Sequence, residues 1–277
     1  MIPAAFEYRR VSSAEEAVAA LGELGDDAKL LAGGHSLLPL MKLRLASPSV
    51  LIDVGRVGDL SYVRDGGDHV AIGALTRHHE VQHNQLLAAE VPLLPHVAGL
   101  VGDPQVRHRG TIGGSIAHGD PASDLPAAVL ALGATIVVQG PGGRREIPVG
   151  DFFRGFLETA LAPDEVLTEI RVPKMHGAGW SYQKFNRRAQ DWAIVGVAAV
   201  GAAAGGGIAL VNMAATPVRA SAVERAVAAG ASAADAAVFA PDGLAPPADL
   251  NASPKYRRHL ATVLVRRALE EVAAAHR

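Results

Sequence analysis

Apolar and polar positions alternate along the first third of the chain in a way that predicts short strands separated by helices. Two overlapping capping boxes, formed by Ser12, Ser13, Glu15 and Glu16, begin a helix with one apolar face, and Gly25 ends it. Strands are predicted at residues 6–8, 50–54 and 69–72. This alternation of helices and strands indicates an α/β arrangement.

Helix and strand patterns continue to the end of the chain, but their order changes after about residue 176. Helices are predicted at about 76–89, at 92–102 and at 123–132, with strands at 134–138 and 166–173. Residues 176–179 are typical of a linker. Beyond the linker, antiparallel strands are predicted at 180–186, 193–203 and 208–214, and helices at 220–229 and 254–276. The last helix has one apolar face, and its arginines at 257, 258, 266 and 267 are expected largely elsewhere.

Two glycine pairs interrupt this pattern. The apolar run Leu30-Leu31 breaks into Ala32-Gly33-Gly34-His35-Ser36, and a second break is Gly110-Thr111-Ile112-Gly113-Gly114-Ser115. Glycine lets backbone N–H groups approach a ligand closely, and consecutive free N–H groups form a nest for an anion. We predict that the two loops face each other and hold one diphosphate. The alternative is that both are tight turns between strands.

Composition and charge exclude several classes of function. The chain has 277 residues, a net charge of -2 and a pI near 6.6, so no global field attracts nucleic acid or an anionic membrane. No uncharged run approaches the roughly 20 residues of a membrane span, and the amino terminus lacks the pattern of a signal peptide. Without cysteine, the chain supplies no disulfide and no thiolate for an iron–sulfur cluster. We therefore expect a cytoplasmic protein that is not integral to the membrane and does not bind nucleic acid.

Two further candidates leave alternatives open. His79-Glu80-Val81-Gln82-His83 matches the H-E-x-x-H zinc motif, but a third ligand is missing and polar neighbours suggest a solvated helix face. We expect no metal site there. Asp124 begins a predicted helix, where it either complements the helix dipole or accepts hydrogen bonds from a ribose. The Rossmann, P-loop and G-x-S-x-G motifs do not occur in the sequence.

The glycine loops, together with Asp103-Pro104-Gln105-Val106-Arg107 and Gly119-Asp120-Pro121, resemble the FAD-binding medium subunits of molybdenum hydroxylases, carbon monoxide dehydrogenases above all. The resemblance covers essentially the whole chain. It implies an α+β fold with a two-part FAD-binding domain of the vanillyl-alcohol-oxidase (PCMH) type over residues 1–176, divided at about residue 55. A smaller flavoprotein domain of antiparallel strands and helices would occupy residues 177–277.

The resemblance also implies which residues bind FAD. Asp124 matches a ribose-binding aspartate, Val101 and Leu167 match positions that flank the adenine, and Lys184 matches a lysine of the flavin site. Trp192 replaces a tyrosine beside the isoalloxazine, and its alternative role is to cover the sheet. The implied contacts, none of them catalytic, are Lys29, Leu30, Leu31, Ala32, Gly33, Gly34, His35, Ser36, Leu37, Val101, Thr111, Ile112, Gly113, Gly114, Ser115, Asp124, Leu167, Lys184 and Trp192.

The implied function is electron transfer. A large subunit would carry the molybdenum cofactor, and a small subunit would carry [2Fe–2S] clusters. Non-covalent FAD on this chain would pass electrons to an acceptor such as a quinone or NAD, within a dimer of heterotrimers that is cytoplasmic or associated with the inner face of the membrane. Two alternatives stay open: a stand-alone flavin oxidase with FAD attached through His35, and a scaffold that has lost its cofactor.

Overall fold

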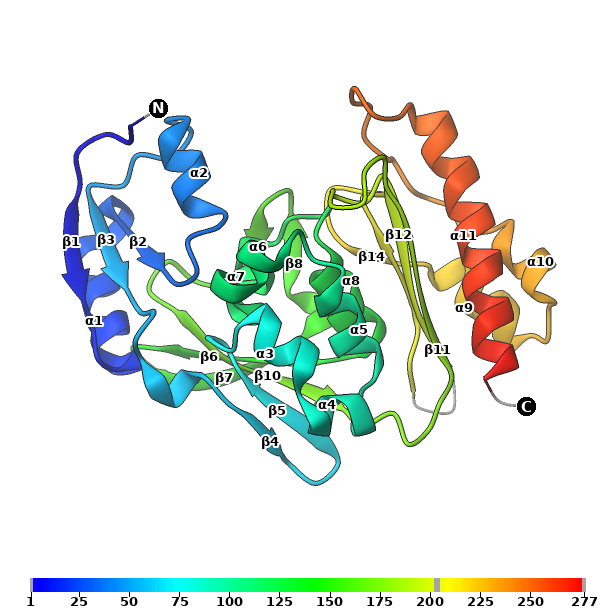
Figure 1. Ribbon diagram of the computed structural model, residues 1–277, viewed down its shortest axis with the longest axis horizontal. Coiled ribbons are helices and arrows are strands. Elements are labelled where there is room, and N and C mark those ends of the chain that lie inside the picture. Colours follow the sequence, from blue (N-terminus) through cyan, green and yellow to red (C-terminus); the bar gives the residue numbers. More distant parts are fainter. Residues whose placement is uncertain (1, 202–204, 276–277) are drawn as a thin grey trace.

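The computed structural model describes residues 2–201 and 205–275, which form three larger sheets and one two-stranded ribbon (Figure 1). The three sheets follow one another along the chain. Helices lie between the second and third sheets and cover the outer face of the third. In the described part of the chain, every helix is too short or too polar to cross a bilayer.

The first sheet is parallel, which agrees with the α/β arrangement predicted for this part of the chain. Its strands are β1 (Glu7–Arg10), β2 (Ala28–Leu31) and β3 (Val50–Asp53), in the order β1-β3-β2. Helix α1 (Ala14–Leu24) connects β1 to β2 and begins at the N-cap Ser13, but the two predicted capping boxes do not close as expected. The Ser13 hydroxyl accepts from the Glu16 amide, and the Glu16 carboxylate accepts from the Ser12 amide at 2.7 Å. Two short 3-10 helices, η1 (Gly25–Asp27) and η2 (Gly58–Leu60), flank this sheet.

The second sheet is antiparallel and has the order β4-β5-β10-β6-β7. Its strands are β4 (Val63–Asp65), β5 (His69–Gly73), β6 (Thr135–Gly140), β7 (Gly143–Pro148) and β10 (Val166–Pro173). The sequence patterns predict β5, β6 and β10 and miss the two edge strands. The 3-10 helix η3 (Val149–Asp151) leads from β7 to the ribbon of β8 (Phe153–Gly155) and β9 (Glu158–Thr159).

The third sheet is antiparallel, as predicted, and has the order β11-β12-β13-β14. Its strands are β11 (Trp180–Phe185), β12 (Val195–Val200), β13 (Ile208–Val211) and β14 (Val218–Arg219). The strand predicted at 193–203 begins two residues later than expected, and its predicted end lies outside the described residues. Helices α9 (Ser221–Ala228), α10 (Ala233–Ala237) and α11 (Pro254–Ala274) pack on one face of this sheet and share its core. The predicted end of α11 at residue 276 is likewise not described.

The main core lies between the second and third sheets. Helices α5 (Leu93–Gly99) and α8 (Asp124–Ala131) fill this layer, and all eight residues of α8 are buried. One hydrophobic cluster contains Ile72 of β5, Leu125 of α8 and Val211 of β13, all fully buried. The two halves of the chain are therefore joined by a continuous apolar interior rather than by a linker alone.

Several predicted boundaries are wrong for identifiable reasons. The helix predicted at 76–89 is two helices, α3 (His78–His83) and α4 (Gln85–Glu90), because Asn84 leaves the helical conformation and caps α4 through its side chain. The stretch 103–107 belongs to a helix, α6 (Pro104–Arg109), with Asp103 as its N-cap. The helix predicted at 123–132 is confirmed as α8; the hydroxyl of Ser123, the residue before it, bonds the Ser115 hydroxyl and does not cap the helix.

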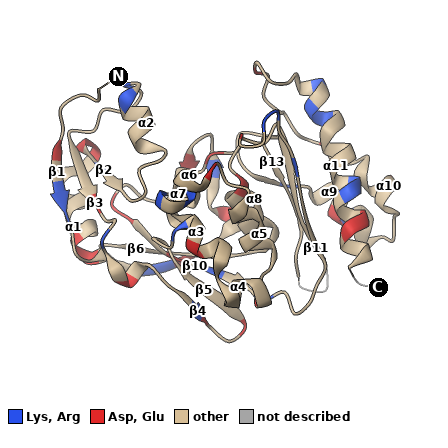
Figure 2. Ribbon diagram, in the orientation of Figure 1, with Lys and Arg blue, Asp and Glu red and all other residues tan. Residues whose placement is uncertain are grey.

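The arginines of α11 do not all face solvent as expected. Arg257 is fully buried, donates to the Ile194 carbonyl and pairs with Asp249 at 2.6 Å. The guanidinium thereby fastens the end of the loop between β11 and β12 to α11. Figure 2 shows residues of both charge signs along α11, so this helix is not a basic surface.

Candidate functional site

The two glycine loops are in direct contact, as predicted. A Cβ atom built on Gly33 would lie 2.8 Å from the Gly110 Cα and 3.0 Å from the Arg109 carbonyl carbon, and closer still to that carbonyl's oxygen. Only glycine at position 33 lets the two backbones approach this closely. The tight-turn alternative also fails for the second loop, because it begins helix α7 (Ile112–His118) rather than joining two strands.

The first loop keeps its backbone donors free. It joins β2 to α2 (Leu37–Lys42), and Gly34 adopts a φ of 78° that side chains disfavour. Within the described residues, the N–H groups at positions 33–36 donate to no protein acceptor. His35 and Ser36 are exposed, so this run of donors is open to a ligand. The loop therefore has the character of an anion nest.

Most backbone N–H groups of the second loop donate to acceptors within the protein, which the sequence patterns did not predict. The Thr111 hydroxyl caps α7 by accepting from the Gly114 amide at 3.1 Å. The amides of Ile112 and Gly113 donate to the carbonyls of Thr76 and Ala74. The second loop is therefore held in place by bonds within the protein. We call the two loops together the cradle, and its free N–H donors come mainly from the first loop.

Asp124 and Lys184, which lie far apart in the sequence, form a buried ion pair. The Lys184 ammonium donates to the Asp124 carboxylate at 2.8 Å and to the Leu100 carbonyl at 3.0 Å. Their side chains are only 7–8% exposed. Tyr182, two residues before Lys184 on β11, donates its hydroxyl to the other Asp124 oxygen at 2.5 Å. The first residue of α8 is therefore tied to the third sheet.

Burial dominates the protonation of this cluster. It raises the pKa of the Asp124 carboxyl above its ordinary value, while the ammonium of Lys184 and the hydroxyl of Tyr182 oppose that rise. Burial and the neighbouring carboxyl raise the pKa of Tyr182 well above its ordinary value, so the phenol stays a donor. Since both Asp124 oxygens already accept bonds from the protein, a ribose would share this carboxylate rather than find it free.

The remaining predicted contacts are placed in different surroundings. Val101 borders the main core, and its carbonyl accepts from Arg107 at 3.0 Å. Leu167 lies in β10, is 6% exposed and belongs to the same core. Trp192 lies in the loop between β11 and β12 and is 67% exposed. The alternative that Trp192 covers the sheet is therefore wrong.

Sequence reasoning missed His78, which lies at the start of α3 beneath the junction of the two loops. Its side chain is 4% exposed, and its backbone N–H donates to the Gly110 carbonyl. Burial, together with the smaller effect of the nearby charges of Arg77, His35 and Arg107, lowers the pKa of the imidazole from 6.5 to about 4. A polar residue before an apolar helix position gives no signal of burial, so only the tertiary structure identifies it.

This lowered pKa predicts acid sensitivity. The unfolded chain binds the proton near pH 6.5 and the folded chain only near pH 4, so stability is complete above 6.5 and falls as pH drops towards 4. The shift corresponds to about 3 kcal/mol. We expect His78→Gln to flatten the loss of stability between pH 7 and pH 4.5, as measured by urea unfolding of the cofactor-free chain. Parallel pH profiles of the two proteins would contradict this.

The H-E-x-x-H motif does not form a metal centre in the described residues. Glu80 uses its carboxylate to accept from the Arg77 amide at 2.7 Å, which caps α3. His83 bonds the His79 carbonyl, and the His79 ring stacks against the rings of His83 and His108 at 4.3 and 4.1 Å. These are the contacts of a polar helix face.

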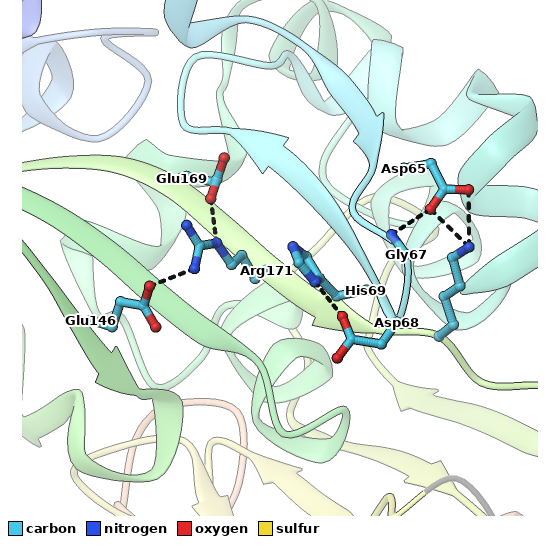
Figure 3. Close-up of polar contacts among 8 residues, drawn as sticks. Asp65, Gly67, Asp68, His69, Glu146, Glu169 and Arg171 are labelled. Atoms are coloured by element: carbon cyan, nitrogen blue, oxygen red, sulfur yellow. Dashed lines mark hydrogen bonds and ion pairs between the residues drawn. The ribbon is translucent and has the colours of Figure 1, made fainter.

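A second polar cluster lies on the open face of the second sheet, and Figure 3 shows its members Glu146, Glu169 and Arg171. Arg171 bridges Glu146 and Glu169 at 2.5 and 2.6 Å, and Tyr62 donates to Glu169 at 2.5 Å. Burial and this carboxylate raise the pKa of Tyr62 to about 12. A cavity of about 290 Å³ borders Tyr62 and Glu169 but no residue of either glycine loop. The cluster links β10 to β7 across β6, and to the residue before β4 across β5, and it does not include a residue of either glycine loop.

Comparison with known proteins gives two family matches. Residues 4–175 match the FAD binding domain in molybdopterin dehydrogenase, and residues 180–272 match the CO dehydrogenase flavoprotein C-terminal domain. The chain is 41% identical over 284 residues to the carbon monoxide dehydrogenase medium chain of Afipia carboxidovorans, covering 99% of both. It is 39% identical over 282 residues to the glyceraldehyde dehydrogenase medium chain of Sulfolobus acidocaldarius, covering 99% of this chain and 100% of that one.

A solved structure is similar over the same length. It is carbon monoxide dehydrogenase from Hydrogenophaga pseudoflava, in a form that lacks the Mo-pyranopterin moiety of the molybdenum cofactor. The two chains share 45% identity and a TM-score of 0.95, with 99% of each covered. Similarity therefore extends across both halves of the chain, including the glycine loops and the C-terminal sheet.

Proposed function

This chain belongs to the FAD-binding medium subunits of molybdenum hydroxylases, and we propose that it is the electron-transfer subunit of such a complex. Its relatives are medium chains of carbon monoxide and aldehyde dehydrogenases, so it is a subunit of a multi-subunit oxidoreductase. We propose that electrons reach it from [2Fe–2S] clusters of a small subunit and leave to an external acceptor such as a quinone or NAD. Carbon monoxide is our proposed substrate for the large, molybdenum-bearing subunit.

The contact between the two glycine loops carries this proposal. The free N–H groups at 33–36 would bind the FAD diphosphate, and Gly110 and α7, which lie against the first loop, would limit where the diphosphate can lie. Bound FAD supplies the exchange of electrons singly and in pairs. The residues fit this group, because a diphosphate needs hydrogen-bond donors and the N–H groups at 33–36 of the described chain have no protein acceptor. We propose non-covalent binding, with His35 shaping the loop.

The buried ion pair of Asp124 and Lys184 would lie at the edge of this site and contact the cofactor. Among the described residues, the Lys184 ammonium has two acceptors for its three donors, so one N–H remains for the cofactor. Charge on this lysine would favour an anionic form of the flavin. We further propose that residues 1–176 and 177–277 are the two domains, since the family matches divide between 175 and 180.

The partner subunits follow from what this chain lacks. A sequence without cysteine supplies no thiolate ligands for iron–sulfur clusters, so a second chain has to hold them. We propose a small [2Fe–2S] subunit and a large molybdenum-cofactor subunit, assembled as a dimer of heterotrimers.

The decisive experiment is purification of the complex through a tag on this chain, with partner subunits co-expressed. We expect molybdenum, iron and about one FAD per chain, with the flavin released into the supernatant on acid denaturation. Flavin that stays with the precipitated chain would instead support covalent attachment at His35. A complex that carries no flavin and takes up none on addition of FAD would overturn the proposed function.

Trp192 offers a separate prediction. Because its side chain is 67% exposed, Trp192→Ala should change the stability of the cofactor-free chain by less than about 0.5 kcal/mol. If the indole lies beside the isoalloxazine, the same substitution shifts the visible absorption bands of the bound flavin. We expect unchanged urea unfolding together with a shifted spectrum. An unmoved spectrum would exclude Trp192 from the flavin environment.

A further inference from the structure

The Asp124 carboxylate lies close to the second glycine loop. The hydroxyl of Ser123, one residue earlier, bonds the hydroxyl of Ser115, the last residue of that loop, at 3.0 Å. This bond joins the start of α8 to α7, which packs against it. A side chain that fixes the Asp124 carboxylate therefore acts at the edge of the cradle.

Two donors on one strand fix this carboxylate. The Tyr182 hydroxyl donates to its Oδ1 at 2.5 Å, and the Lys184 ammonium donates to its Oδ2 at 2.8 Å. Residues two apart on a strand point to the same face, so β11 holds both oxygens from one side. On β12, Gly196 pairs with Lys184 and leaves room for the phenol, because a Cβ atom there would lie 3.2 Å from the hydroxyl oxygen. A carboxylate has about four lone-pair positions, so each oxygen keeps one for a ligand.

The Tyr182 phenol favours the ionised form of this carboxyl. Its side chain is 7% exposed, and within the described residues its hydroxyl bonds Asp124 alone. Burial raises the pKa of Asp124, Lys184 and Tyr182 lower it, and Asp120, in the turn before α8, raises it. Without the phenol, the carboxyl takes up a proton at a higher pH. A phenylalanine would fill the same space without burying a hydroxyl, so packing alone does not account for a tyrosine here.

The elements around α8 add few other titratable groups at this end of the helix. Strands β12 and β13 carry no titratable side chain. Arg219 of β14 donates to the Leu130 carbonyl at the other end of α8, and the His96 ring of α5 lies 5.2 Å from that of Trp180. Helix α7 has one titratable side chain, His118, at its last position. Protonation of these histidines affects a wild-type protein and a Tyr182 variant alike, so a comparison of the two cancels it.

We propose that Tyr182 is a positioning residue for FAD, whose hydroxyl holds the Asp124 carboxylate in the orientation that accepts hydrogen bonds from the cofactor. Tyr182 acts through Asp124 rather than on the flavin itself. This inference rests on the proposed function, since it needs FAD at the edge of the cradle. It adds to the FAD site a residue that lies outside both glycine loops.

Tyr182→Phe tests this role in the complex, purified with its partner subunits and depleted of flavin. We expect FAD to bind about threefold more weakly at pH 8 and at least about 10-fold more weakly at pH 6, because the carboxyl is protonated sooner without the phenol. Tyr62→Phe is the matched control. It also removes a phenol that donates to a carboxylate at 2.5 Å, but in the cluster on the second sheet, so it should bind FAD like the wild type at both pH values.

A double variant shows whether Tyr182 acts through Asp124. Adding Tyr182→Phe to Asp124→Asn should change FAD affinity by less than about twofold at either pH, because no carboxylate remains for the phenol to hold. This comparison also decides the matter if Tyr182→Phe alone fails to fold, since a neutral side chain at position 124 does not need the phenol.

Two results would overturn the assignment. One is a pH profile of FAD affinity for Tyr182→Phe that runs parallel to that of the wild type, which a packing role alone would give. The other is an equal loss of affinity when Tyr182→Phe is added to Asp124→Asn. If the wild-type complex itself binds no FAD at either pH, the proposed function fails instead, and the two failures are distinguishable.

Discussion

Gly33→Ala should abolish FAD binding and destabilise the chain. The new methyl group would lie 2.8 Å from the Gly110 Cα and 3.0 Å from the Arg109 carbonyl carbon, which are backbone atoms that cannot rotate away. The loops have to separate, at a cost of about 1–3 kcal/mol for overpacking. Because the cradle exists only where the loops touch, we expect the complex to retain less than about a tenth of its flavin. Flavin content and urea unfolding measure the two effects.

Gly22→Ala is the matched control for this substitution. Gly22 lies in α1, and a Cβ atom there would meet nothing within 4 Å. Alanine is the better helix former, so this variant should gain about 0.5–1 kcal/mol and keep its flavin. If Gly33→Ala binds FAD as tightly as Gly22→Ala, contact between the loops is not what forms the site.

Lys184→Met should destabilise the chain by about 3–5 kcal/mol, because it leaves the Asp124 carboxylate buried without its cation. Burial raises the pKa of Asp124, so the carboxyl can take up a proton when Lys184 is removed, and the loss of stability then lies at the lower end of this range. Adding Asp124→Asn to Lys184→Met removes the orphaned charge and should restore part of the loss. Urea unfolding of the two single variants and the double variant gives the coupling energy, which we expect to exceed about 2 kcal/mol.

A surface pair of comparable length provides the contrast. Arg9 and Glu23 approach to 2.6 Å, but their side chains are 44% and 62% exposed. Arg9→Met should therefore cost less than about 1 kcal/mol and show little coupling to Glu23. Equal coupling in the two pairs would mean that burial is not what makes the Asp124–Lys184 pair important.

Local signals in the sequence identified much of the fold. The start of α1 at Ser13, the glycine that ends it and the antiparallel strands after residue 180 are confirmed, because each depends on neighbours within a few residues. The family resemblance and its α+β architecture are confirmed by similarity over the full chain. The edge strands β4, β7 and β14 escaped prediction, since an edge strand is fixed by its partner strand rather than by its own pattern.

The candidate site divides in the same way. Glycine pairs are visible in sequence because only glycine tolerates the backbone of Gly34, and their contact could be proposed from their matching composition. In the second loop, the amides of Ile112 and Gly113 donate to the carbonyls of Thr76 and Ala74, which lie more than thirty positions away in the sequence. No local pattern distinguishes a free N–H group from a bonded one.

By itself, the sequence determined the two glycine loops, the start of helices at their N-caps and the absence of cysteine thiolates for an iron–sulfur cluster. The tertiary structure alone decided that Asp124 meets Lys184, that Arg257 and His78 are buried, and which backbone donors stay free. The physical reason is that backbone conformation follows from nearby residues, whereas burial and charge pairing depend on segments brought together only when the sheets pack.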